Sequence, residues 1–211
     1  MPDSVSKDPL VWIDCEVCIS HIFPSSTLPR FAEDLQMTGL DPEQDTIMQI
    51  ACYITDADLN LMEEKGFEVV IQHSKEQLDR MGEWCTKHHG ESGLTSACLA
   101  STVTPEKAAQ QLQQYIQNLV PKSRKALLAG NSVHADRAFL VKAPFNIVTD
   151  HLHYRILDVS SIKEAARRWA PVHILKQTPA KKGLHEARED ILESIREARF
   201  YRQVFFMKSQ S

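Results

Sequence analysis

The chain has 211 residues, a formal net charge of −4, 43% apolar residues and 25% charged residues. This length predicts one domain with a sizeable core, and the negative charge argues against wrapping a long nucleic acid, although a short oligonucleotide could still be held through metal ions. No apolar run approaches the roughly 20 residues that cross a bilayer and the N-terminus has no signal or transit pattern, so we expect an intracellular protein, cytoplasmic or mitochondrial, with no membrane partner.

The first half of the chain predicts three strands followed by two helices. Short apolar or β-rich runs indicate the strands, which are residues 10–13, 47–55 and 67–72. Ser74 and Gln77 form a capping-box pattern that opens a short helix. Thr104 and Pro105 provide the N-cap and the first residue of a longer helix, which runs to about residue 119.

In the second half, predicted strands alternate with helices. Residues 126–130 and 156–159 are the strands, and a helix follows the first of them from about residue 135. Ser160 is the expected N-cap of the next helix, and residues 184–206 have the apolar spacing of a last one. Three consecutive strands followed by this alternation predict an α/β fold, with a mixed five-stranded sheet flanked by helices.

Two carboxylates follow the first apolar run. Asp14 and Glu16 are two residues apart, so on a strand both side chains project from the same face. Like charges beside the buried Trp12-Ile13 segment are costly to desolvate unless a cation lies between them. Divalent cations that prefer oxygen ligands meet this need. The pattern alone is weak, because most such acidic pairs lie on protein surfaces.

Three further residues could join this pair. Asp136 comes after a predicted strand, near the first turn of a helix, where an acidic residue also favours the helix dipole. His185 and Asp190 lie at the start of the last predicted helix, about 140° apart on an ideal helix. They converge on one site only if His185 lies at or before the helix start, and Gly183 provides such a break.

In this order, the four acidic residues and His185 resemble the DEDD exonucleases of the histidine variant, which share a ribonuclease H-like fold. Within that group the chain looks like the oligoribonucleases. The segments that carry the resemblance are residues 12–16, 37–42, 84–94, 130–140, 153–159, 165–169 and 183–191. They cover nearly the whole chain outside the two termini and residues 17–36.

The resemblance implies a 3′-to-5′ exoribonuclease that degrades very short RNA, especially dinucleotides, to 5′-nucleoside monophosphates. Two divalent cations, Mg²⁺ or Mn²⁺, would be held by Asp14, Glu16, Asp136 and Asp190. His185 would take a proton from the attacking water. The alternatives are another DEDD exonuclease that acts on longer RNA or DNA, and an impaired or inactive relative that only binds nucleotides.

The same resemblance implies a set of substrate contacts. The residues concerned are Leu40, Trp84, His89, Ser132, Tyr154, Arg155 and Ser160. Leu40 would wedge between two bases and Trp84 would stack on one. Neither contact depends on the identity of the base. The histidine and the two serines would lie near the 5′-phosphate. Tyr154 and Arg155 would come from the neighbouring subunit of a homodimer.

Residues 17–36 interrupt this pattern. Removing them joins Glu16 to Met37 and restores the continuous family motif Trp-Ile-Asp-Cys-Glu-Met-Thr-Gly-Leu-Asp. The segment has no helical or strand period, so we expect an irregular insertion that impairs cleavage. The expected organisation is a single domain over residues 1–211, with flexible ends at 1–8 and 208–211.

The codons at the ends of the insertion suggest its origin, and a second alignment of this region is also possible. Val17-Cys18 can be encoded by a donor splice sequence and Gln36 by an acceptor end, so we hypothesise a retained intron or a gene-prediction error. A rival alignment concerns the metal ligands instead, and it puts Asp34 and Gln36 in place of Asp14 and Glu16. It is the weaker one, because glutamine is a poorer metal ligand and Pro29 makes residues 29–33 a poor buried strand.

Overall fold

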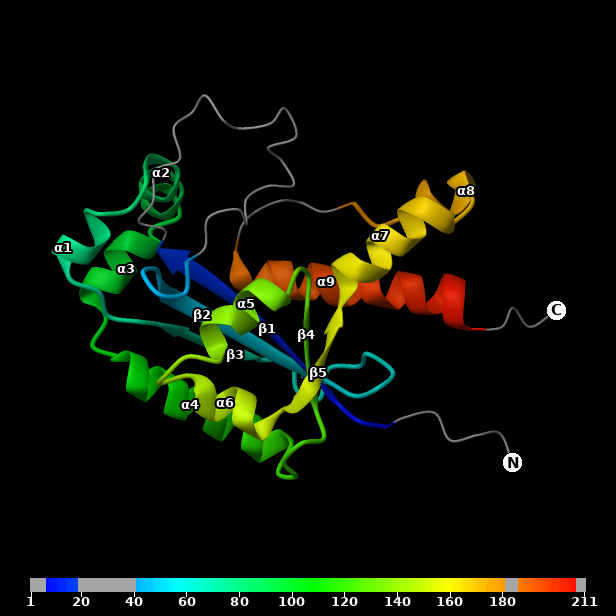
Figure 1. Ribbon diagram of the computed structural model, residues 1–211, viewed down its shortest axis with the longest axis horizontal. Coiled ribbons are helices and arrows are strands. Elements are labelled where there is room, and N and C mark those ends of the chain that lie inside the picture. The colour runs from blue at the N-terminus through cyan, green and yellow to red at the C-terminus, as the bar shows by residue number, and fades with distance from the viewer. Residues whose placement is uncertain (1–6, 19–40, 181–185, 208–211) are drawn as a thin grey trace.

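The computed structural model describes residues 7–18, 41–180 and 186–207. Its sheet has five strands in the order β3-β2-β1-β4-β5 (Figure 1). The strands are β1 (Leu10–Cys18), β2 (Thr46–Thr55), β3 (Phe67–Val70), β4 (Leu127–Gly130) and β5 (His153–Asp158). The β1–β2 and β2–β3 pairs are antiparallel, and the β1–β4 and β4–β5 pairs are parallel. The predicted mixed five-stranded sheet is therefore confirmed.

The helices are α1 (Lys75–Leu78), α2 (Glu83–Glu91), α3 (Leu94–Ala100), α4 (Pro105–Leu119), α5 (His134–Leu140), α6 (Asn146–His151), α7 (Val159–Trp169), α8 (Val172–Leu175) and α9 (Ala187–Tyr201), with a π-helical turn at Arg202–Phe206. The predicted N-caps Ser74 and Thr104 are confirmed, because each side chain accepts a hydrogen bond from the backbone N–H three residues later. The N-cap of α7 is Asp158 rather than Ser160, because the Asp158 carboxylate accepts the N–H of Ser160.

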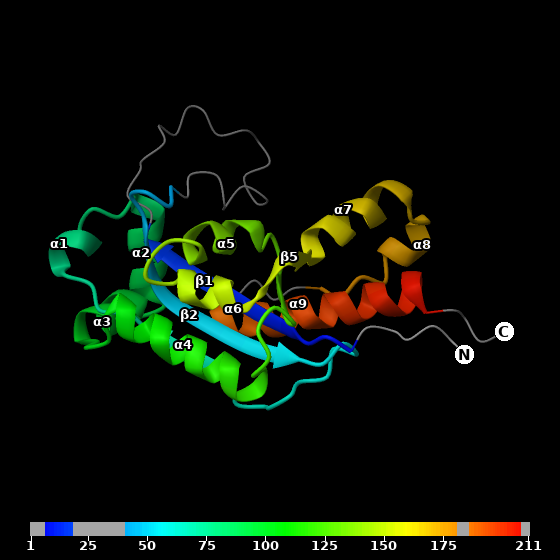
Figure 2. The same cartoon turned by 60° about the horizontal axis from the view of Figure 1, so that its bottom comes forward.

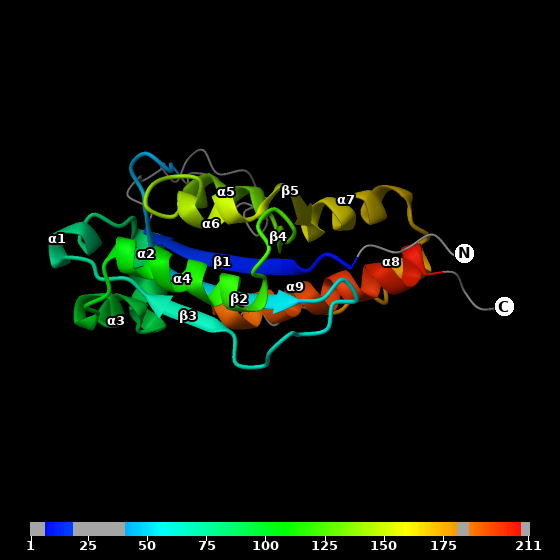
Figure 3. The same cartoon turned by 90° about the horizontal axis from the view of Figure 1, so that it is seen from below.

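Alternation along β1 decides which helices its side chains face. Val11 and Ile13 lie in the apolar cluster that α4, α5 and α6 cover. Leu10 and Trp12 lie in the cluster that α7 and α9 cover. Figure 3 shows β1 between α5 and α6 on one side and α9 on the other. Since successive side chains of a strand point to opposite faces, Asp14 and Glu16 also face α9.

The end of β1 corrects one expectation about residues 17–36. Val17 and Cys18 continue the strand after a register shift between Glu16 and Val17, and they pair with Ile47 and Thr46 of β2. The prediction of an irregular segment is wrong at these two residues, because the β2 ladder extends far enough to pair their backbone groups. Residues 19–36 lie outside the described residues.

Helices α1, α2 and α3 gather beyond the carboxyl end of β1 (Figure 2). They form a small apolar cluster of their own with Met48 of β2. Because β1, β4 and β5 run parallel, their carboxyl ends lie at one edge of the sheet, where α/β proteins place ligands. No described helix combines the length and the apolar composition that crossing a bilayer requires.

Candidate active site

Three carboxylates meet where β1 faces α9. Oxygen atoms of Asp14, Glu16 and Asp190 lie within 4.8 Å of one another. Asp14 and Glu16 share one face of β1 because they are two residues apart. Asp190 lies in the first turn of α9, which packs on that face through Ala187 and Ile191. The structure thus brings together three of the four carboxylates that were expected at one site.

The fourth carboxylate, Asp136, approaches β1 from α5. Its Oδ1 accepts the backbone N–H of Cys15 at 3.0 Å, and its side chain is buried in the first turn of α5. Because Cys15 lies between Asp14 and Glu16 in the strand, this hydrogen bond fixes Asp136 beside both. Asp136 stands outside the 4.8 Å group formed by the described residues.

Burial and mutual repulsion make these carboxylates costly to charge without a cation. Burial, with the charge of Asp190 adding to it, raises the pKa of Glu16 to about 7. The pKa of Asp136 is also raised, by burial first and by Glu16 and Asp158 in addition. A cluster of repelling carboxylate oxygens is the donor set that Mg²⁺ and Mn²⁺ prefer. The residues therefore fit a divalent cation.

Two residues with expected roles, His185 and Leu40, lie outside the described residues. Asp34 and Gln36, the pair of the rival alignment, lie outside them as well. The strand at the centre of the sheet is Leu10–Cys18, and it carries the other acidic pair next to α9. The described structure therefore favours the alignment in which this strand supplies the first two carboxylates.

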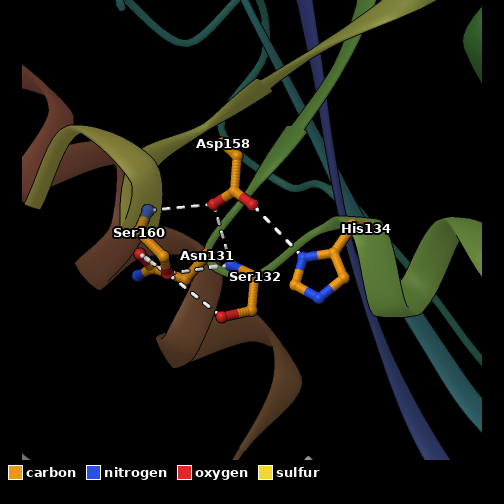
Figure 4. A network of polar contacts seen from close by, with 5 residues as sticks. All are labelled: Asn131, Ser132, His134, Asp158 and Ser160. Carbon is orange, nitrogen blue, oxygen red and sulfur yellow. Dashed lines mark hydrogen bonds and ion pairs between the residues drawn. The ribbon is translucent and has the colours of Figure 1, made fainter. Parts of the chain in front are cut away.

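Ser132 and Ser160 meet where β4 and β5 end (Figure 4). Their hydroxyl oxygens are 3.1 Å apart, and the Ser132 N–H donates to Ser160 Oγ at 2.9 Å. Oδ1 of Asp158 accepts the N–H of Ser132 at 3.0 Å and that of Ser160 at 2.9 Å. Oδ2 of Asp158 lies 3.4 Å from Nδ1 of His134. The partly buried Asp158 carboxylate thus orders both serines.

Asp158 was not among the residues predicted for this edge. An aspartate directly before a helix is a common N-cap signal, and it could have been found on that ground. Assigning the cap to Ser160 concealed it. The structure shows that Ser160 is left with its hydroxyl oriented toward Ser132 and Asn131 instead.

Helix α2 presents Trp84 and His89 near the end of β1. Trp84 is 45% exposed and its ring centroid lies 4.0 Å from that of His88, so it is an accessible aromatic surface rather than a core residue. His89 is buried, and burial lowers its pKa, while a hydrogen bond with the Val17 backbone opposes this. Nε2 of His89 is buried without a hydrogen-bond partner among the described residues.

Tyr154 and Arg155 lie on β5, an edge strand of the sheet. The Tyr154 side chain is 65% exposed, Arg155 is exposed too, and the Arg155 guanidinium lies 5.4 Å from the centre of the Tyr154 ring. A large aromatic residue this exposed on a sheet edge is available to another chain.

Metal affinity should rise as the pH rises through about 7, because Glu16, with its pKa raised to about 7, must lose its proton to bind a cation. The unfolded chain releases this proton near 4.5. The metal-free protein should therefore lose stability as the pH rises from about 4.5 to about 7, and Mg²⁺ should restore it.

Thermal unfolding with Mg²⁺ or with a chelator, repeated across this pH range, measures the effect, and calorimetry measures the released protons. Glu16→Gln removes one titrating group and should reduce the dependence, leaving the part that comes from Asp136, whose pKa is also raised. A metal affinity that is constant across the range would contradict this assignment.

Solved structures share the fold at low sequence identity. Pop2p of Schizosaccharomyces pombe, in its Mg²⁺ and Mn²⁺ bound form, matches with a TM-score of 0.63 and 15% identity over 94% of this chain and 84% of that chain. Exonuclease I of Methylocaldum szegediense matches with a TM-score of 0.58 and 16% identity over 94% of this chain and 41% of that chain. The chain thus spans about two fifths of that enzyme. These likenesses confirm the expected ribonuclease H-like fold.

Sequence comparison identifies the family described as Exonuclease over residues 31–198, a range that begins after β1. The chain is 46% identical over 199 residues to the probable oligoribonuclease of Schizosaccharomyces pombe (93% of this chain, 68% of that protein). It is 47% identical over 175 residues to the mitochondrial oligoribonuclease of Mus musculus (83% and 72%), and 48% over 173 residues to the oligoribonuclease of Pseudoalteromonas translucida (82% and 93%). The chain therefore belongs to the exonuclease family, in its oligoribonuclease branch.

Proposed function

We propose that this chain is a 3′-to-5′ exoribonuclease that degrades very short RNA, dinucleotides above all, to 5′-nucleoside monophosphates. The observation that carries the proposal is the group of carboxylates from Asp14, Glu16 and Asp190, within 4.8 Å of one another, in a chain of the exonuclease family. The relatives' names support short RNA as the substrate. The mitochondrial relatives support an intracellular location, mitochondrial or cytoplasmic.

The proposed cofactors are two divalent cations, Mg²⁺ or Mn²⁺. The residues that would hold them are Asp14, Glu16, Asp136 and Asp190. When bound, such ions stabilise the negative charge that develops on the attacking and leaving oxygens of a phosphodiester. The chain contributes the rigid placement of the ligands. Asp14 and Glu16 are fixed in a central strand, and the Cys15 N–H holds Asp136 beside them.

His185 is the proposed general base, by the family resemblance. The ordinary histidine pKa near 6.5 suits proton removal from water around neutral pH. His185 could converge with Asp190 only if it precedes the last helix. That helix, α9, begins at Ala187, so the sequence position of His185 meets this condition.

The proposed substrate contacts divide between bases and phosphate. Stacking on Trp84 and wedging by Leu40 are indifferent to base identity, which suits an enzyme that acts on RNA of any sequence. Ser132, Ser160 and His89 would bind the 5′-terminal phosphate. Nε2 of His89, which is buried without a partner among the described residues, is a polar group that such a phosphate would satisfy, and the paired serine hydroxyls could turn to donate to it.

Substrate length provides the test of the proposed function. With Mn²⁺ present, a ribodinucleotide should be cleaved faster than a seven-residue RNA, and the products should carry 5′-phosphates. Asp136→Asn is the control for contaminating nucleases. Faster cleavage of the longer RNA, or of DNA, would identify a different DEDD exonuclease. Binding of the dinucleotide without cleavage would identify an inactive relative.

A homodimer with composite sites is also proposed, in which Tyr154 and Arg155 complete the site of the neighbouring subunit. Their exposure on an edge strand supports this arrangement. The expected result is complementation between two inactive variants. One carries Asp136→Asn, and the other carries Tyr154→Ala with Arg155→Ala.

A mixed dimer has one complete site, in which an intact Asp136 of one subunit meets an intact Tyr154 and Arg155 of the other. Half of the dimers in a refolded equal mixture are mixed. The mixture should therefore regain roughly a quarter of wild-type activity. Each variant refolded alone is the control. No recovery in a mixture that sedimentation shows to be dimeric would contradict the composite site.

A further inference from the structure

Arg188 anchors the first turn of α9, and among the described residues the N-cap Glu186 contributes no side-chain capping hydrogen bond. Nη2 of Arg188 donates to the Tyr53 hydroxyl at 2.7 Å and to the Lys65 carbonyl oxygen. Its Nη1 lies 3.8 Å from Oε2 of Glu68. These partners belong to β2, to β3 and to the connection between them. One side chain thus ties the start of α9 to the outer part of the sheet.

The connection that Arg188 reaches is itself held firmly. The Glu63 carboxylate accepts the backbone N–H of Lys65 at 3.0 Å and that of Gly66 at 2.5 Å. The Tyr115 hydroxyl of α4 donates to the same carboxylate at 2.6 Å. Gly66, with φ at +66°, packs so closely on Tyr53 that a Cβ would lie 2.7 Å from the ring. Arg188 therefore binds a fixed point rather than a loose loop.

The position of Arg188 on α9 links this anchor to the carboxylates. Arg188 and Asp190 are two residues apart, so they lie about 200° apart around the helix axis, on opposite flanks. Bonds that hold one flank resist rotation of the first turn about its axis. That rotation would carry Asp190 away from Asp14 and Glu16 on β1.

We propose that Arg188 is a positioning residue for the carboxylate site. Its hydrogen bonds to Tyr53 and Lys65 set the rotation of the first turn of α9 and hold Asp190 against the carboxylates of β1. The inference rests on the proposed metal site, and it adds a residue that would touch neither metal nor substrate. Removing a group that orients a metal ligand typically weakens metal binding about 10- to 100-fold.

Arg188→Ala in the full chain tests the proposal. Mn²⁺ affinity is measured from the electron paramagnetic resonance signal of the free ion, and kcat and KM are measured on a ribodinucleotide. We expect Mn²⁺ affinity to fall about 10- to 100-fold, and kcat to fall while KM changes little. Arg188→Lys keeps the charge and one donor toward Lys65, so it should recover part of both losses. Tyr53→Phe keeps the ring against Gly66 and should produce a smaller loss of affinity.

Arg199→Ala is the matched control. Arg199 lies about three turns further along α9. Its Nε and Nη2 bind the carbonyl oxygen of Leu59, in the same connection, at 3.1 and 2.6 Å. Arg188→Ala and Arg199→Ala should both lower thermal stability, but Arg199→Ala should leave Mn²⁺ affinity unchanged because this anchor is remote from Asp190.

Two results would overturn the proposal. One is unchanged Mn²⁺ affinity in both Arg188→Ala and Tyr53→Phe, and the other is an equal loss of affinity in Arg199→Ala. Wild-type protein that binds no Mn²⁺ would overturn both this proposal and the metal site. Wild-type protein that binds Mn²⁺ but leaves the dinucleotide intact would refute the proposed function alone, and the Mn²⁺ affinities of the variants would still decide the role of Arg188.

Discussion

Replacing Asp190 by asparagine should lower kcat/KM for a ribodinucleotide by about 1000-fold or more. Asp190 is one of three carboxylates within 4.8 Å, and an amide in its place removes one negative ligand from the proposed metal site. A metal centre contributes several kcal/mol of transition-state charge stabilisation. Each 1.36 kcal/mol is tenfold in rate, so losing about 4 kcal/mol gives this factor. Steady-state kinetics at saturating Mn²⁺ measure it.

The same substitution should raise the thermal stability of the metal-free protein above pH 7. Burial and the charge of Asp190 raise the pKa of Glu16 to about 7, so above that pH the ionised Glu16 and Asp190 repel each other in the folded chain. A neutral asparagine removes the repulsion. Because the variant should then be more stable but less active, unfolding would not explain its loss of activity. Glu189→Gln, at the preceding position of the same turn, is the matched control and should change neither activity nor stability much. Activity of Asp190→Asn within about tenfold of wild type would exclude Asp190 from the metal site.

The sheet and part of the site were predictable because they depend on local patterns. The two-residue spacing of Asp14 and Glu16 predicts a shared face on any strand, and β1 confirms it by facing both toward α9. Asp136 was expected near a helix start after a strand, and it lies in the first turn of α5. The convergence of Asp190 with β1 was different. Spacing alone could not place a C-terminal helix on the first strand, and only the family resemblance implied it.

Features that depend on distant partners were not predictable. Helix α2 was missed because it buries only Cys85 and His89, which leaves no apolar stripe to read. Arg188 stands among other charged residues at the start of the last helix, and its local sequence does not distinguish it from them. Its partner Tyr53 is 135 residues away in the chain, and the periodicity of the local sequence does not indicate such a contact. Long-range polar contacts of this kind follow from the packed fold rather than from the helix that carries them.

Removing residues 17–36 should raise kcat/KM for a ribodinucleotide by about 100-fold. In the present chain Val17 and Cys18 follow Glu16 and occupy the last two ladder positions of β1. In the shortened chain Met37 and Thr38 would follow Glu16 and take these positions. The β2 partners of the ladder remain unchanged, so we expect the strand to form in both chains.

The gain is expected because the shortened chain sets the proposed wedge, Leu40, four residues after Glu16. A misplacement of about 1 Å in a group that orients the substrate can cost about 100-fold in rate. The insertion separates Leu40 from Glu16 by twenty further residues, 17–36. Extra length in a connection between strands costs little folding stability, so catalysis rather than folding should carry the penalty.

Three chains measure this: the full chain, the shortened chain, and a chain in which residues 19–36 are replaced by a glycine–serine linker of equal length. Thermal unfolding should be similar in all three, while only the shortened chain should gain activity. A linker chain as active as the shortened one would assign the impairment to the sequence of the insertion rather than its length. Equal activity of the full and shortened chains would contradict the impairment. Genomic codons for residues 17, 18 and 36 that cannot supply splice boundaries would exclude the retained intron.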